Sequence, residues 1–167
     1  MKKIIKKIIP ETFINWYHFC ETFLGAFLYG FPGYSENVKI IGITGTNGKS
    51  TTVYLLSQIL EEAGFKVAYF SSVKSKIRKE EKTNMLKMTM PGRFTLQRFI
   101  RKSIEKECDY IVLEVTSEGI KQFRHSFIDF KGAIFTNLTP EHIESHGSFK
   151  KYRENHYIEN KKFGGKP

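Results

Sequence analysis

The chain has 167 residues and a mass of 19.4 kDa; 40% of the residues are hydrophobic and 14% are aromatic. This length can bury the core of one domain, and the apolar content excludes a largely disordered chain. Only two cysteines occur, Cys20 and Cys108. They are too few for a disulfide scaffold or a four-cysteine zinc site, and they favour a cytoplasmic location.

The formal net charge of +10 is unevenly distributed along the chain. Residues 1–10 contribute +4, residues 74–106 contribute +8 and residues 150–167 contribute +4, whereas the segments between them are mildly acidic. Such basic segments suit a nucleic-acid or membrane surface, or a solvated face beside a small anionic substrate. Because no RNA-binding motif, zinc finger or basic zipper accompanies the charge, we predict no nucleic-acid partner.

Residues 12–35 contain a single formal charge, Glu21. Polar residues and Pro32-Gly33 interrupt this run, so it is not predicted to cross a membrane, and it lacks the cleavage site of a signal peptide. The alternative to packing on the domain is a weak contact of residues 1–31 with a membrane surface, helped by four lysines in residues 1–10. The apolar residues recur at helical spacing and predict an amphipathic helix packed on the rest of the chain: Phe13, Trp16, Tyr17, Cys20, Phe23, Leu24, Phe27 and Leu28.

After Pro32-Gly33 the sequence alternates between β-branched runs and helical spacing, which is typical of an α/β fold with a parallel sheet flanked by helices. Residues 74–92 are polar, basic and without a clear period, and they predict a long loop. We divide the chain into a basic, amphipathic helical segment (residues 1–37) and one α/β domain (residues 38–167). The predicted strands cover residues 38–44, 67–72, 110–115 and 133–136, and the predicted helices cover residues 49–63 and 95–107.

The strongest local signal is the sequence GTNGKST at residues 45–51, between a predicted buried strand and a predicted helix. Glycines let backbone N–H groups approach phosphate oxygens, and the N-terminus of a helix favours an anion. Lys49 would neutralise the β and γ phosphates, and the Ser50 hydroxyl would bind Mg²⁺. A full Walker motif has a further glycine where this chain has Ile43. The placement between strand and helix nevertheless predicts nucleotide binding.

Further motifs extend this signal to about residue 152. With the loop, and in this order, they resemble the central ATP-binding domain of the Mur ligase superfamily, and they are most similar to the UDP-N-acetylmuramoyl-tripeptide synthetases. Residues 38–167 would then be part of that domain. The motifs are Thr89-Met90-Pro91-Gly92, EVTSEGI at 114–120, QFR at 122–124, TNL at 136–138, EHIESHGS at 141–148, and Tyr152.

The resemblance implies an ATP-dependent ligase of peptidoglycan precursor synthesis. ATP would phosphorylate the terminal carboxylate of UDP-N-acetylmuramoyl-dipeptide, and the amine of an amino acid would then displace phosphate. By resemblance, Lys49, Glu114 and His142 are catalytic, and Ser50, Glu114 and His142 bind Mg²⁺. The residues that would bind ATP are Gly45, Thr46, Asn47, Gly48, Lys49, Ser50 and Thr51, and those that would bind the UDP-muramoyl-dipeptide are Thr89, Met90, Thr116, Gln122 and Arg124.

The sequence departs from the family pattern at four places. Met90 stands where the family's Thr-Thr-Pro has its second threonine, and Glu118 stands where its Ser-Ser-His has histidine. Glu141 stands where its Asp-His has aspartate, before His142. The family's carbamylated lysine corresponds to His156, so that Lys161 or Lys162 would have to replace it.

The resemblance covers about the first half of a central domain, so we expect a truncated chain that is inactive by itself. Two other functions remain open. One is a different ligase of the superfamily, of the folylpolyglutamate or cyanophycin synthetase type. The other is a non-catalytic ATP-binding module.

Overall fold

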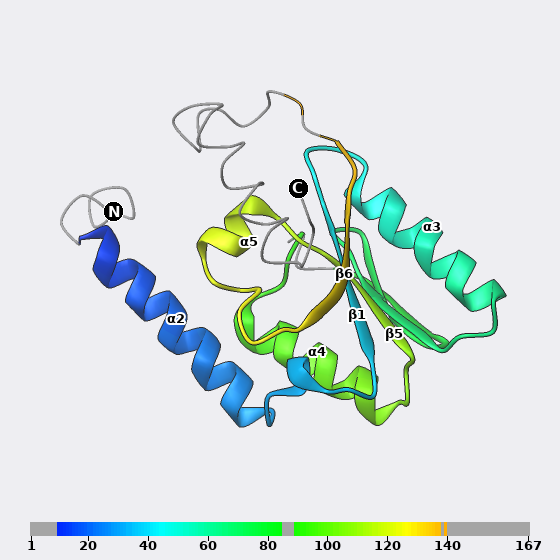
Figure 1. Cartoon of the computed structure of the whole chain (residues 1–167), viewed down its shortest axis with the longest axis horizontal. Helices are drawn as coiled ribbons and strands as arrows, with labels where there is room; N and C mark the ends of the chain where they lie inside the picture. The colour runs from blue at the N-terminus through cyan, green and yellow to red at the C-terminus, as the bar shows by residue number, and fades with distance from the viewer. Residues whose placement is uncertain (1–9, 85–88, 138, 140–167) are drawn as a thin grey trace.

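The computed structural model of the protein describes residues 10–84, 89–137 and 139. Within them, six strands form one sheet in the order β4-β3-β2-β5-β1-β6 (Figure 1). The strands are β1 (Lys39–Thr44), β2 (Val67–Phe70), β3 (Lys74–Ile77), β4 (Glu80–Thr83), β5 (Tyr110–Glu114) and β6 (Phe130–Phe135). The helices are α2 (Glu11–Leu28), the short 3-10 helix η1 (Pro32–Tyr34), α3 (Lys49–Glu62), α4 (Arg93–Glu105) and α5 (Ser117–Lys121).

The four strands expected from the sequence form the parallel part of the sheet. Strand β1 pairs in parallel with β5 and with β6, and β5 pairs in parallel with β2. The carboxyl ends of β1 and β5 therefore lie beside each other, with Ile43 opposite Glu114. The predicted α/β class is confirmed, and both helices expected between these strands are present as α3 and α4.

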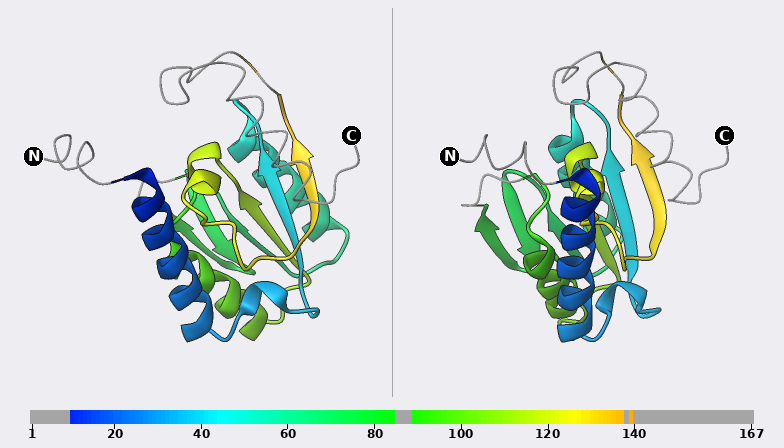
Figure 2. Two further views of the ribbon diagram at one scale, coloured as in Figure 1. Left: turned by 60° about the vertical axis from the view of Figure 1, so that its left-hand side comes forward. Right: turned by 90° about the vertical axis from the view of Figure 1, so that its left-hand side faces the viewer.

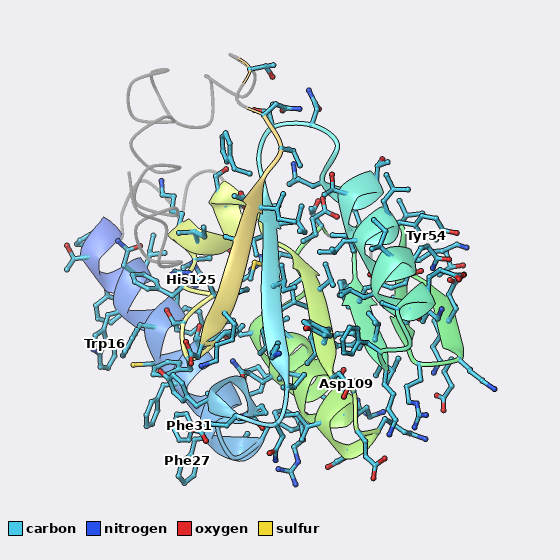
Figure 3. All side chains as sticks on the ribbon, turned by 45° about the vertical axis from the view of Figure 1, so that its right-hand side comes forward. Trp16, Phe27, Phe31, Tyr54, Asp109 and His125 are labelled. Atoms are coloured by element: carbon cyan, nitrogen blue, oxygen red, sulfur yellow. The ribbon has the colours of Figure 1, made fainter. Side chains whose placement is uncertain are left out.

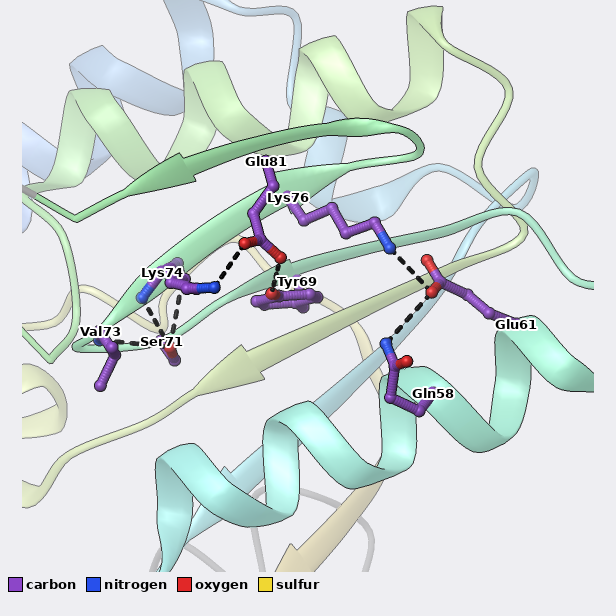
Figure 4. Close-up of polar contacts among 8 residues, drawn as sticks. All are labelled: Gln58, Glu61, Tyr69, Ser71, Val73, Lys74, Lys76 and Glu81. Atoms are coloured by element: carbon purple, nitrogen blue, oxygen red, sulfur yellow. Dashed lines mark hydrogen bonds and ion pairs between the residues drawn. The ribbon is translucent and has the colours of Figure 1, made fainter.

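The long loop predicted over residues 74–92 is wrong in its first half, because β3 and β4 form an antiparallel hairpin that extends the sheet beyond β2. Side chains of β2 and α3 hold this polar hairpin (Figure 4). The Tyr69 hydroxyl donates to Glu81 over 2.9 Å, and the Lys74 ammonium lies 2.6 Å from the other oxygen of Glu81. Lys76 forms an ion pair of 2.8 Å with Glu61 of α3. Backbone pairing and these polar contacts stabilise the hairpin. It lacks the alternating apolar residues from which a strand is predicted in a sequence.

Alternate residues of the central strands build a separate core on each face of the sheet. In β5, Ile111 and Leu113 pack with α4, whereas Val112 packs on the face covered by α3. In β2, Phe70 belongs to the α4 side and Tyr69 to the α3 side. The sheet thus lies between helices on both faces (Figure 1), and all these residues are at least 90% buried.

Helix α2 is the predicted amphipathic helix, and it lies against α4 (Figure 2). The helix packs on the domain as predicted, but through its small residues and not through the predicted apolar face. Its buried residues are the small ones, Thr22, Gly25 and Ala26, and Phe94 of α4 lies within van der Waals distance of the position that a side chain on Gly25 would take. Small residues let two helices approach closely, so the large apolar residues project away from the sheet. Within the described part of the chain, no helix has the length and apolar character needed to cross a membrane.

Candidate functional site

The loop of residues 45–48 joins the carboxyl end of β1 to the first turn of α3. Two of its glycines adopt backbone conformations that other residues rarely adopt, with φ of 131° at Gly45 and 79° at Gly48. Gly48 is also the residue that caps the N-terminus of α3. These conformations turn the chain sharply from strand to helix, and they direct the positive end of the α3 dipole at the loop.

The segment that follows β6 holds the loop in place. The backbone N–H of Thr46 donates to the carbonyl of Asn137 over 2.9 Å, and the N–H of Asn47 donates to the Asn137 side chain over 2.9 Å. The Thr136 hydroxyl donates in turn to the carbonyl of Asn47 over 2.7 Å. Two residues distant in sequence, Thr136 and Asn137, thus fix the loop, although only the glycine pattern marks it in the sequence.

Lys49 is the first residue of α3, and its side chain folds back over the loop. Its Nζ donates to the carbonyl of Gly45 over 2.8 Å and to the carbonyl of Thr46 over 2.7 Å. A half-buried ammonium therefore lies beside the loop at the N-terminus of α3, where both the charge and the helix dipole attract an anion. Thr51 lies exposed in the same first turn.

Ser50 and Glu114 meet at the adjoining ends of α3 and β5. The Ser50 hydroxyl donates to Oε2 of Glu114 over 2.8 Å, and it lies 2.7 Å from the Ser72 hydroxyl. The backbone N–H of Ser72 also donates to Glu114 Oε2 over 2.8 Å. Glu114 is 3% exposed. A carboxylate and two hydroxyls are the hard oxygen ligands that Mg²⁺ prefers, so the residues present fit a magnesium ion.

A second cluster lies just after Glu114, around helix α5. Thr116 caps this helix, and its hydroxyl accepts from the N–H of Gly119 over 3.0 Å. The Arg124 guanidinium donates twice to the side-chain oxygen of Gln122, over 3.1 and 2.7 Å, and once to the carbonyl of Met90. Thr89 precedes Met90 and is half-buried. The five residues predicted to bind the muramoyl substrate are therefore adjoining in the fold.

Arg124 and Arg93 connect this cluster to the helices beneath it. Burial, and secondly the nearby charge of Arg93, lower the pKa of the Arg124 guanidinium. Arg93 donates to the carbonyl of Gln122 and forms an ion pair of 2.8 Å with Glu21 of α2. Gln122 thus accepts hydrogen bonds from both arginines, Arg124 at its side chain and Arg93 at its carbonyl.

Some of the predicted site lies outside the described residues: His142, His156, Lys161 and Lys162. Among the residues that are described, no group of three or more His, Cys, Asp or Glu side chains is placed to hold a metal ion.

Two residues beside the phosphate loop were not among the predicted site residues. Ser72 follows β2 and contacts both Ser50 and Glu114, and the polar pair Ser71-Ser72 at the carboxyl end of a predicted strand was the available signal. Asn137 belongs to a motif already noted, but its bonds to the loop depend on the pairing of β6 with β1.

Comparison with known families identifies the domain. The sequence profile of the Mur ligase middle domain matches residues 43–157, which is more than half of the chain. The chain belongs to the Mur ligase middle domain family. The match begins in β1, immediately before the phosphate loop.

The chain is also similar to individual ligases. It is 39% identical over 124 residues to the UDP-N-acetylmuramoyl-L-alanyl-D-glutamate–2,6-diaminopimelate ligase of Clostridium botulinum, covering 74% of this chain and 25% of the relative. The ligase of the same name from Syntrophomonas wolfei is 37% identical over 130 residues, covering 78% and 26%. The chain thus spans about a quarter of the length of these relatives.

Two solved structures share the fold. A UDP-N-acetylmuramoyl-L-alanyl-D-glutamate–2,6-diaminopimelate ligase superposes with a TM-score of 0.63 at 24% identity, covering 71% of this chain and 23% of that one. E. coli FolC in complex with DHPP and ADP superposes with a TM-score of 0.52 at 19% identity, covering 76% and 36%. At these identities both comparisons describe the architecture of the domain.

Proposed function

We propose that this domain binds ATP and Mg²⁺ for a ligase that adds an amino acid to UDP-N-acetylmuramoyl-dipeptide in the cytoplasm. The single observation that carries the proposal is the contact of Ser50, in the phosphate loop, with the buried carboxylate of Glu114. It joins a phosphate-binding element to a divalent-cation ligand. The relatives that share 39% and 37% identity are named as ligases of this substrate class.

In this proposal, the loop of residues 45–51 binds the phosphates of ATP through its backbone N–H groups. Lys49 neutralises the charge that develops as the γ-phosphoryl group is transferred. Ser50, Glu114 and Ser72 would hold Mg²⁺, which supplies charge neutralisation at the phosphates when bound, and His142 would be a further ligand. The remaining residues position the two reacting groups.

The reaction that we propose has two steps. An oxygen of the substrate's terminal carboxylate attacks the γ-phosphorus of ATP, so that ADP leaves and an acyl phosphate forms. The amine of the amino acid then attacks the acyl carbon, the carbon–oxygen bond to phosphate breaks, and an amide, inorganic phosphate and a proton are released. Holding the reactants in place is the main contribution of the protein to such a reaction.

The cluster of Thr89, Met90, Thr116, Gln122 and Arg124 would hold the anionic muramoyl substrate. Arg124 can bind a carboxylate or phosphate in bidentate fashion, and the basic segment of residues 74–106 adds positive charge in the neighbouring sequence. Because the chain spans about a quarter of its relatives' length, we assign nucleotide binding to it and propose that amide formation requires further portions of the enzyme.

Calorimetric titration of the chain with ATP in the presence of Mg²⁺ tests the proposal. Lys49→Ala removes a charge-assisted contact worth about 1.5–3 kcal/mol, so its affinity for ATP should fall about 10- to 150-fold. Lys39→Ala, an exposed lysine at the opposite end of β1, is the matched control and should bind as the unmodified chain does. Absence of ATP binding by the unmodified chain, or equal binding by Lys49→Ala, would contradict the proposal.

A further inference from the structure

Helix α2 carries a large apolar surface that the described residues cover only in part, where the rings of Phe31 and Phe127 contact Phe23. We call it the aromatic stripe. Figure 3 shows Trp16 and Phe27 projecting from α2 on the side away from Tyr54 of α3. Trp16 is 64% exposed and Phe27 is 61% exposed. The stripe comprises Phe13, Trp16, Tyr17, Phe23, Leu24, Phe27 and Leu28, all of them exposed.

The stripe is exposed although α2 is packed against the domain. The opposite side of α2 is seated on α4 through Thr22, Gly25 and Ala26, and the ion pair between Glu21 and Arg93 fixes it further. Phe19, at the border of the stripe, and Phe23, within it, contact the ring of Phe127. The helix is therefore held by one side, and its apolar side is presented to the surroundings.

The charges near the stripe indicate which kind of surface it binds. Within residues 12–35 the single formal charge is Glu21, and Arg93 neutralises it. The ten residues at the start of the chain contain four lysines and no acidic residue. Positive charge that precedes an apolar helix in the sequence is complementary to a bilayer of anionic lipids, whose surface attracts lysines and whose interior accepts apolar side chains.

The side chains of the stripe also suit a lipid interface. Tryptophan and tyrosine have an apolar ring and one polar group, and they concentrate where hydrocarbon meets water. The Tyr17 hydroxyl donates to Glu21 over 2.6 Å, on the side of the helix that borders the stripe. A helix of 18 residues with one apolar face can lie in the plane of a membrane surface without crossing it.

We propose that α2 binds the surface of an anionic bilayer, with the aromatic stripe among the acyl chains; the four lysines of residues 1–10 would contribute positive charge to this binding. This places the nucleotide site on a domain attached to a membrane surface. The proposal rests on α2 and on the charge of the first ten residues, and it is independent of the ligase activity.

The chain contains its own reporter, because Trp16 is its only tryptophan. Mixed with vesicles of phosphatidylglycerol and phosphatidylcholine, the full chain should show a blue shift of tryptophan emission, and brominated lipid should quench it. Vesicles of phosphatidylcholine alone should bind at least about tenfold more weakly. Replacing the four lysines by glutamine should weaken binding to anionic vesicles by a similar factor.

Vesicle flotation of paired variants tests whether membrane binding requires the stripe itself or any exposed apolar residues of the chain. Phe13→Glu with Phe27→Glu should lose at least tenfold in the bound fraction. The matched control is Leu55→Glu with Ile59→Glu, on α3 at the other face of the sheet, where the exposures are 55% and 65%. The control should float as the unmodified chain does, and circular dichroism should show that both pairs are folded.

Two results would overturn the proposal. One is the recovery of the unmodified chain only in the unbound fraction, with no shift of Trp16 emission. The other is a blue shift that grows with protein concentration in the absence of lipid, together with dimers in sedimentation, which would assign the stripe to a second copy of the chain. The binding of ATP in the same samples would show whether the nucleotide site is intact in either case.

Discussion

The phosphate loop and the turn of residues 116–124 follow neighbouring strands, β1 and β5, but they are stabilised in different ways. Backbone conformation shapes the loop, with positive φ at Gly45 and Gly48. In the turn Phe123 also has a positive φ of 58°, but side-chain hydrogen bonds tie it to a distant segment, where Arg124 joins Gln122 to Met90, a residue 34 positions away. The loop therefore requires glycines that can adopt these conformations in addition to its bonds to Thr136 and Asn137, whereas the side-chain bonds of the turn depend on the partners that the fold brings together.

The largest effect expected from this comparison is at Gly45. An added Cβ there would lie 2.2 Å from the Thr136 hydroxyl and 2.9 Å from the carbonyl of Asn137, so the loop would have to leave the segment that holds it. Gly45→Ala should lower the free energy of unfolding by about 3 kcal/mol or more and abolish ATP binding. Urea denaturation and ATP titration measure the two effects.

Gly48→Ala is the matched control, because among the described residues no atom beyond its chain neighbours and the backbone of its own helix lies within 4 Å of the added Cβ. Only its positive φ opposes the change, and the cost should be about 1 kcal/mol. Equal losses at the two glycines would show that conformation alone, and not the contact with Thr136 and Asn137, holds the loop.

A smaller effect is expected at Arg124. Arg124→Ala removes hydrogen bonds from a charged group to Gln122 and Met90, at a cost of about 1.5–3 kcal/mol in unfolding free energy. Binding of UDP-N-acetylmuramoyl-dipeptide should weaken as well, whereas ATP affinity should change by less than about threefold. Arg101→Ala, which breaks an exposed pair with Glu105, is the control and should cost under about 0.5 kcal/mol. A large loss of ATP affinity in Arg124→Ala would show that the two clusters are one unit.

The same contrast explains what the sequence could predict. The strands near Ile40 and Ile111 were predicted from short apolar runs rich in β-branched residues, and the helix after Lys49 was predicted from apolar residues at helical spacing. The loop before that helix was predicted from its glycines, so the local sequence was sufficient for these elements. The positions of Glu114 and Arg124 came from a resemblance to a family, and the structure places them in contacts consistent with those roles. The roles themselves stay predictions.

Tertiary contacts account for what the sequence did not predict. The β3–β4 hairpin has polar strands stabilised by Tyr69 and Glu81, so it lacks the alternation that marks a buried strand. The stripe of α2 has the spacing of a core face, but a close approach of α2 to Phe94 at Gly25 turns it outward. Ser72 became visible as part of the site only when β2 was placed beside β5.

The central claim is that the phosphate loop and Glu114 form one centre for ATP with Mg²⁺. The most direct measurement is ATP affinity with Mg²⁺ and with EDTA, compared between the unmodified chain and Glu114→Gln. The amide has the same shape and can still accept from Ser50, so the fold should persist. We expect the unmodified chain to bind ATP at least about tenfold more tightly with Mg²⁺, and we expect Glu114→Gln to lose this preference while it binds ATP in EDTA as before. An undiminished preference for Mg²⁺ in Glu114→Gln would contradict the account.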